Sequence, residues 1–165
     1  STTTVSSAVS EVDISSNINS TYKSYMIDIL NLSLATNAQE LRVRFFQGGS
    51  VDTGSVYDSY QYQMNADDGG SPSSYKDANS DHMGLADEVR NNAEDTLYAR
   101  CYLYDPANTA TDTKMAAHVV YARSDTASQA LFGGRIEETA AVDGIRFYMA
   151  SGNIDGGIFK LYGIT

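Results

Sequence analysis

The sequence predicts an all-β fold, an antiparallel β-sandwich of jelly-roll type with about eight strands. Apolar and polar side chains alternate in one segment after another, which is the pattern of strands with one buried face. Clusters of Gly, Asn, Asp and Ser separate these segments, and no convincing amphipathic helix interrupts them. The chain also contains 12 Tyr but no Trp, and Tyr favours strands and half-exposed surfaces.

Residues 21–34 form the first long strand of the prediction. Tyr25, Ile27 and Ile29 share one face, whereas Met26 and Leu30 lie on the other. Apolar residues on both faces indicate a central strand, or a strand whose outer face contacts a partner. After a polar turn, residues 41–47 alternate again, and we expect them to pair with the first strand as a hairpin.

The middle of the chain is predicted to be a tyrosine-rich strand followed by a long acidic loop. The strand covers residues 56–64 and contains Tyr57, Tyr60 and Tyr62. The loop covers residues 65–92, where Asp, Gly and Ser recur, and loops of this length are usually functional or disordered. A short strand near residues 82–85 is expected to interrupt it. Further strands are predicted at residues 96–104, 114–123 and 129–137.

Two strands joined by a tight turn are predicted at the end of the sequence, in residues 143–164. Ile145 and Phe147 alternate with polar neighbours in the first of these strands. Gly152 lies between Ser and Asn, where positive φ angles allow the chain to reverse. Gly156 and Gly157 then permit a bulge or a close backbone approach in the last strand.

Size and composition favour one globular domain. The chain has 165 residues, of which 42% are hydrophobic, so it can bury a sizeable core. We expect a single sandwich domain at residues 11–165, preceded by a flexible or partner-bound arm at residues 1–10. The predicted core residues are Ile27, Ile29, Leu41, Val43, Phe45, Leu97, Leu103, Ile145, Phe147 and Leu161.

The formal net charge of −10 argues against direct binding to nucleic acid, which requires clustered Lys and Arg. Acidity of this degree favours solubility, and the alternatives are a basic partner surface or divalent cations. No apolar run is long enough to span a bilayer, so we expect no contact with a membrane. The first twenty residues also lack the pattern of a signal peptide.

No pattern in the sequence indicates a catalytic residue or a cofactor. Cys101 lies on the apolar face of its strand and is expected to be a small buried hydrophobe. His118 is expected at a solvent-facing strand position. His82 stands beside Asp81, where a pH-sensitive contact is the alternative to an ordinary loop residue.

A metal site is not expected, but calcium remains an alternative in the acidic loop. Its carboxylates are hard oxygen ligands of the kind that Ca²⁺ prefers. The candidate ligands are Asp67, Asp68, Asp77 and Asp81. Their spacing does not match an EF-hand, and a solvated acidic surface is the competing interpretation.

Aromatic strand faces are the predicted interaction surfaces, because Tyr and Arg are enriched in protein interfaces. One strand projects three Tyr with an Arg between them, and the strand at residues 56–64 carries three more Tyr. The interface candidates are Tyr98, Arg100, Tyr102, Tyr104, Tyr57, Tyr60 and Tyr62. An outer sheet face covered by a loop is the alternative.

Residues 141–164 read A-V-x-G-I-R-F-Y-x-x-S-G-N-I-x-x-G-x-x-x-L-Y-G-I. Upstream, residues 22–29 read Y-x-x-Y-x-I-x-I, residues 41–44 read L-x-x-R, and residues 48–50 read G-G-S. In these motifs the chain resembles a group of small bacteriophage virion structural proteins, the capsid decoration and tail-associated β-sandwich proteins. The resemblance covers both ends of the chain well and residues 63–93 poorly.

The resemblance implies a virion protein without enzymatic activity, assembled in the host cytoplasm. We expect a capsid decoration (cement) protein that binds the outside of the head, contacts the major capsid protein and stabilises the shell. A homo-oligomer, with a trimer favoured, would suit the local threefold axes of a shell. The alternative is a tail fibre or receptor-binding module that recognises host carbohydrate, and a third hypothesis is a glycan-active enzyme.

Overall fold

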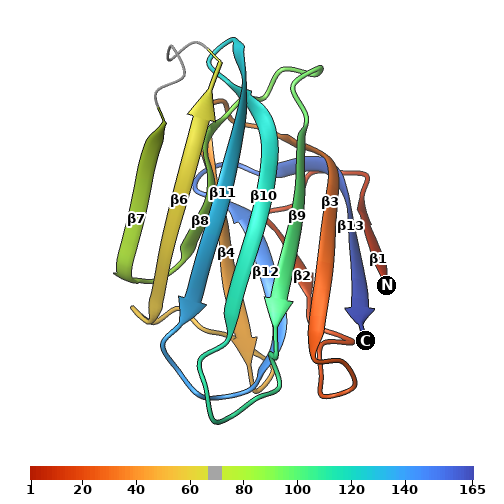
Figure 1. The fold of residues 1–165 in the computed structure, drawn as a ribbon. Coiled ribbons are helices and arrows are strands. Elements are labelled where there is room, and N and C mark those ends of the chain that lie inside the picture. The colour runs from red at the N-terminus through yellow and green to blue at the C-terminus, as the bar shows by residue number, and fades with distance from the viewer. Residues whose placement is uncertain (67–71) are drawn as a thin grey trace.

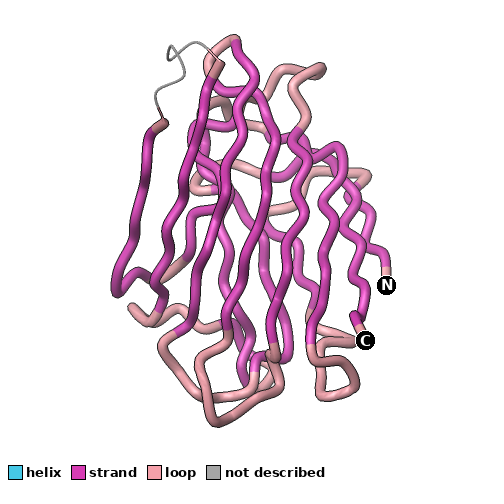
Figure 2. The backbone as a smooth tube through the Cα atoms, viewed as in Figure 1, coloured by secondary structure: helices cyan, strands magenta, loops and turns pink. Residues whose placement is uncertain are grey.

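The computed structural model describes residues 1–66 and 72–165, and it is a β-sandwich in which every strand pair is antiparallel (Figures 1 and 2). The larger sheet contains, in spatial order, β1 (Thr2–Val5), β13 (Ile154–Ile164), β3 (Ser24–Leu34), β9 (Leu97–Tyr104), β10 (Lys114–Arg123), β11 (Thr126–Ile136), β6 (Tyr57–Asn65) and β7 (Ser73–Ser80). The smaller sheet contains β8 (Met83–Val89), β4 (Gln39–Gln47), β12 (Val142–Met149) and β2 (Glu11–Ile14), with the short β5 (Ser50–Val51) beside β4.

The predicted fold class is therefore confirmed, although the described residues form 13 strands where about eight were expected. The described residues form no helix that could cross a membrane. The chain passes from one sheet to the other at most of its connections, as it does in jelly-roll and Greek-key sandwiches. A single bridge between Val89 of β8 and Arg123 of β10 joins the two sheets at one edge.

The core lies between the two sheets and contains all ten core residues predicted from the sequence. The rings of Phe147 on β12 and Phe159 on β13 lie 5.4 Å apart and connect the layers. Both side chains are fully buried, and burying one aromatic or aliphatic side chain contributes about 1.5–3 kcal/mol. Cys101 is also fully buried, as expected, and burial raises the pKa of its thiol to about 12.

The C-terminal turn and bulge also agree with the sequence analysis. Gly152 has a φ of 78°, and the turn around it carries the chain from β12 in one sheet to β13 in the other. The register of β13 against β3 shifts on both sides of Gly156. Because Gly157 has a φ of 148°, a side chain at this position would be strained.

The long acidic loop predicted for residues 65–92 is wrong. Most of this segment consists of two strands, β7 and β8, and the strand expected near residues 82–85 is the first half of β8. Within residues 1–66 and 72–165, the edge strand β7 pairs only with β6, and its side chains are mostly polar. It therefore lacks the apolar alternation by which strands are detected in a sequence.

The predicted hairpin between residues 21–34 and residues 41–47 is also wrong. The strands exist as β3 and β4, but they lie in different sheets and do not pair. β3 pairs with β13 and β9, whereas β4 pairs with β12, β8 and β5. Each strand carries a row of large apolar side chains, and placing the strands in opposite layers buries both rows in the same core.

The first residues of the segment expected to be an arm lie against the larger sheet. Thr2–Val5 form β1, which pairs with residues 157–160 of β13. Val9 makes a further bridge to Ile154. In this structure the segment thus supplies the strand that covers the edge of β13.

Candidate functional site

The solvent-facing side of the larger sheet is the first candidate site, and we call it the outer face. Side chains alternate strictly along β9, β10 and β6, so every second residue points away from the core. The apolar and aromatic members of the outer face are Met26, Leu30, Tyr60, Tyr62, Met64, Tyr98, Tyr102, Tyr104, Val120, Leu131 and Tyr162. This set includes five of the seven interface candidates predicted from the sequence.

Strand register aligns these side chains in rows across the sheet. One row contains, from β13 to β6, Tyr162, Met26, Tyr102, Ala116, Gly133 and Tyr60. In the middle of the row, Ala116 and Gly133 have small side chains or none. They are flanked by the large rings of Tyr102 on one side and Tyr60 on the other. The row therefore has large aromatic side chains on both sides of two small residues.

Large apolar groups on this face are open to solvent. The exposed fraction is 53% for Leu131, 50% for Tyr60, and 45% for both Val120 and Tyr98. Scattered exposed apolar residues are ordinary on protein surfaces, but these come from neighbouring strands of one sheet. Contiguous apolar surface of this kind marks interaction sites in soluble proteins.

Polar contacts hold parts of the outer face in place. The Arg100 guanidinium donates to both carboxylate oxygens of Asp28, at 2.7 and 3.1 Å. The hydroxyl of Tyr98 donates to Asn31. A hollow of about 450 Å³ lies beside Tyr98, Arg100 and Val120. His118 is exposed at the rim of this hollow, which agrees with its predicted solvent-facing position.

The proposed interface role of Tyr57 is wrong, because its side chain points into the core. Tyr57 is fully buried, and its hydroxyl accepts a hydrogen bond from the Phe45 N–H at 2.9 Å and donates to the carbonyl of Asp52 at 3.1 Å. Successive side chains of a strand point to opposite faces. Tyr60 and Tyr62 are an odd number of residues from Tyr57, so they lie on the solvent side of β6. The hydroxyl of Tyr57 thus connects the larger sheet to the smaller one.

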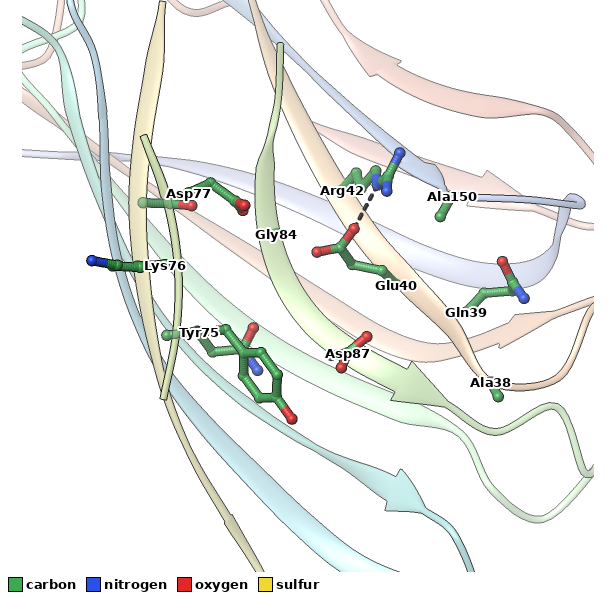
Figure 3. Close-up of a pocket in the computed structure, with 12 residues that line it drawn as sticks. Ala38, Gln39, Glu40, Arg42, Tyr75, Lys76, Asp77, Gly84, Asp87 and Ala150 are labelled. Atoms are coloured by element: carbon green, nitrogen blue, oxygen red, sulfur yellow. Dashed lines mark hydrogen bonds and ion pairs between the residues drawn. The ribbon is translucent and has the colours of Figure 1, made fainter. Parts of the chain in front are cut away.

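The second candidate site is a polar cavity of about 360 Å³ where β6 and β7 face β4 and β8. Figure 3 shows Asp77 on one side of this cavity, Glu40 on the other, and Gly84 of β8 between them. Lys76 points away from the cavity, whereas Tyr75 and Asp87 lie along it. We call this space the acidic cavity.

The floor of the acidic cavity is polar because the inner face of β6 is polar. Ser59 and Gln61 line the cavity, although both are more than nine-tenths buried. The Gln61 amide donates to Gln63 at 3.3 Å, and the Gln63 amide donates to Asn65 at 3.0 Å. Buried polar groups of this kind need hydrogen-bond partners. Here the side chains of Gln61, Gln63 and Asn65 bond one another along the strand.

Among the charged groups of the cavity, Glu40 is closely paired. Burial alone would raise the pKa of Glu40, but hydrogen bonds from His82 and Arg42 outweigh it and lower that pKa. The Arg42 Nε lies 2.6 Å from Glu40 Oε2, and the His82 Nε2 lies 3.5 Å from the same oxygen. The contact with Glu40 raises the pKa of His82, and Asp81 adds to the effect. Burial raises the pKa of Asp87.

The structure separates the calcium candidates. Asp67 and Asp68 lie outside the described residues. Asp81 binds Arg44 and the ring of His82, whereas Asp77 faces the acidic cavity. Glu40 and His82 join Asp77 there, and the sequence analysis did not identify Glu40 as a site residue. A signal existed in β6, where Ser59, Gln61, Gln63 and Asn65 recur at every second position and indicate an unusually polar inner face.

Comparisons with known proteins show only distant likeness. No family model matches this sequence, and no curated protein matches it. Among solved structures, a GH43 protein, BlXynB mutant K247S from Bacillus licheniformis, is 6% identical with a TM-score of 0.35, and the match covers 87% of this chain and 28% of that one. A xylan beta-1,4-xylosidase from Bacillus halodurans C-125 is 9% identical with a TM-score of 0.33, covering 86% and 28%.

A protein of unknown function from Bacteroides ovatus is 8% identical with a TM-score of 0.23, and the match covers 88% of this chain and 47% of that one. The chain therefore spans less than a third of the length of the two Bacillus proteins and about half of the third. TM-scores this low support no inference about function.

Proposed function

We propose that this chain is a non-catalytic virion structural protein that attaches to neighbouring virion proteins through the outer face of its larger sheet. The observation that carries the proposal is the solvent-exposed set of Tyr, Met, Leu and Val side chains on adjacent strands. The proposed location is the outside of the phage head, as a decoration protein in contact with the major capsid protein. Docking of this kind stabilises the assembled form of a shell by mass action.

The composition of the outer face favours a protein partner over a sugar. Tyr, Met and Arg are enriched in protein interfaces, while Lys and Glu are depleted there. Leu131 and Val120 offer aliphatic surface without hydrogen-bonding groups, and Arg100 is already paired with Asp28. A partner that buries these groups gains mainly from the hydrophobic effect.

The resemblance to phage virion proteins supports the proposal in a limited way. The motif residues Ile145, Phe147, Ile154 and Leu161 are all buried, and Gly152 forms the turn. The motif therefore specifies the C-terminal part of the fold, while the outer face is built largely from other strands. Head and tail locations both agree with such a motif, and the proposed trimer is an independent prediction that light scattering can measure.

Co-sedimentation with particles that lack the chain tests the proposal. Purified protein should bind these particles with a copy number comparable to that of the major shell protein. The double variant Val120→Lys/Leu131→Lys should lose most of this binding, because two charges would enter the interface. Ser16→Lys, in an exposed loop beyond β2, is the matched control and should bind normally.

Normal binding by the double variant would overturn the proposed surface. Binding confined to the tail, at low copy number, would instead overturn the head location. Turnover of a polysaccharide by the pure protein would contradict the non-catalytic assignment.

A receptor-binding module for carbohydrate is the second candidate, and one hollow on the outer face favours it. This hollow, of about 320 Å³, lies beside Tyr60, has Gly133 and Gly134 in its floor, and has Lys114 and Arg135 at its rim. An aromatic ring next to hydrogen-bonding groups can hold a sugar. Glycan-array binding that Tyr60→Ala abolishes would support this function, and absence of binding across the array would remove it.

A further inference from the structure

Three potential metal ligands converge in the acidic cavity from three separate strands or turns. Glu40 belongs to β4, Asp77 to β7, and His82 to the turn that precedes β8. One ligand atom of each lies within 4.8 Å of the ligand atoms of the other two. All three side chains are half-buried, so the cluster differs from ordinary exposed acidic surface.

The imidazole of His82 has the orientation of a metal ligand. Its Nδ1 lies 2.6 Å from Asp81 Oδ1, which leaves Nε2 directed toward Glu40. Asp81 is in turn held by Arg44, whose Nε donates to the Asp81 carbonyl at 2.7 Å. Metal-binding His residues almost always donate the second ring N–H to a carboxylate, a backbone carbonyl or water, and this bond fixes the ring and its tautomer.

Gly84 leaves the space in which the two carboxylates meet. A Cβ atom at this position would fall 2.2 Å from Glu40 Oε1 and 3.7 Å from Asp77 Oδ2. Both oxygens therefore border the same small volume above β8. Arg42 is bonded to the other oxygen of Glu40, Oε2, so Oε1 is available to a ligand.

Ser59 supplies an independent sign that a polar ligand belongs here. It pairs directly across from Asp77 in the β6–β7 register, lines the cavity, and is only 8% exposed. Its hydroxyl makes no hydrogen bond among the described residues. The hydroxyl is therefore free to bond a water molecule or an ion held in the cavity.

We propose that Glu40, Asp77 and His82 form a binding site for a divalent cation of the zinc class, with Asp81 orienting His82. Zn²⁺ takes carboxylate oxygen and imidazole nitrogen in a tetrahedral arrangement, and the fourth position can hold water. Ligand atoms bound at about 2.0–2.1 Å stand about 3.4 Å apart, so the side chains need to close by about 1.4 Å at most. Two carboxylates also neutralise the charge of the ion.

The ligand set favours zinc over calcium. Ca²⁺ takes six to eight oxygen ligands, whereas this cluster offers two carboxylates and one imidazole. Imidazole suits Zn²⁺ and similar transition metals. Of the calcium candidates suggested by the sequence, Asp77 is thus a ligand of the proposed site and Asp81 orients a ligand.

Isothermal titration of untagged, chelator-treated protein tests the site, with ZnCl₂ and CaCl₂ in separate experiments. We expect one zinc ion per chain and weaker binding of calcium. Asp77→Asn and His82→Gln should each lower zinc affinity at least tenfold, the loss usual even for residues that only support a ligand. Asp155→Asn removes an exposed carboxylate on β13 and is the matched control, with unchanged affinity.

Asp77 makes no hydrogen bond or ion pair among the described residues, so Asp77→Asn should keep the circular dichroism spectrum and metal-free Tm of the wild type. The inference is overturned if zinc shows no saturable binding near one ion per chain. It is also overturned if Asp77→Asn or His82→Gln binds zinc as the wild type does, or if calcium binds more tightly than zinc.

Discussion

Removing the buried hydroxyl of Tyr57 is the most direct test of how the two sheets are held together. Tyr57→Phe removes this hydroxyl and keeps the ring, which lies 6.1 Å from the ring of Phe45 in an edge-on contact. The substitution therefore changes hydrogen bonding between the layers and leaves apolar packing intact. Burial is also the main reason that the pKa of Tyr57 lies far above its usual value.

The expected cost follows from the two hydrogen bonds of this hydroxyl. The Phe45 N–H loses its acceptor in a fully buried position, and an unsatisfied buried donor costs about 1–3 kcal/mol. The Asp52 carbonyl is half-buried and can bind water instead, so its loss adds less. We expect Tyr57→Phe to lower the free energy of unfolding by about 2 kcal/mol in total.

Urea unfolding followed by circular dichroism measures this change, provided that the m-value stays constant. Tyr60→Phe is the matched control, because Tyr60 is half-exposed and makes no hydrogen bond among the described residues. We expect that variant to remain within about 0.5 kcal/mol of the wild type. The reasoning would be refuted if the two variants were equally stable.

Three further predictions concern the core and the acidic cavity. Phe147→Ala should lower the free energy of unfolding by about 3–5 kcal/mol, because it leaves a cavity between the sheets; a loss under about 1 kcal/mol in urea unfolding would contradict this packing. The Cys101 thiol, with a pKa of about 12, should react with a thiol reagent only after unfolding, and rapid reaction of the native protein would show that the strand opens readily. In chelator, His82 should stabilise the fold fully below its ordinary pKa of 6.5 and lose this contribution as pH rises through its raised pKa, because its charge is then lost. His82→Gln should flatten the fall in Tm above pH 6.5, and an unchanged slope would refute the pairing with Glu40 and Asp81.

The agreement between sequence and structure is best where one face of a strand is apolar. Ile27, Val43 and Phe147 belong to rows of alternating apolar residues, and all three are fully buried. The same period of two places Tyr98 and Tyr104 on the solvent side. The same alternation places Tyr57 and Tyr60 on opposite faces of β6. The interface role predicted for Tyr57 was wrong because all tyrosines of this strand were assigned to one face.

The sequence was least informative where strands are polar. β7 has only one neighbouring strand and faces a polar cavity, so apolar alternation is not needed there and the strand resembles a loop. The hairpin predicted from β3 and β4 failed for another reason. Alternation shows which side chains are buried, but it does not show which strand lies beside which.

The amino-acid sequence by itself determined that this protein is a sandwich of antiparallel strands with a defined set of buried side chains. This follows because burial of alternate residues is a local property of each strand. Only the tertiary structure decided which strands adjoin, that the tyrosines of separate strands align in rows, and that Glu40, Asp77 and His82 meet. These residues are brought together by pairing and packing across long sequence distances, and no local pattern of side chains encodes such contacts.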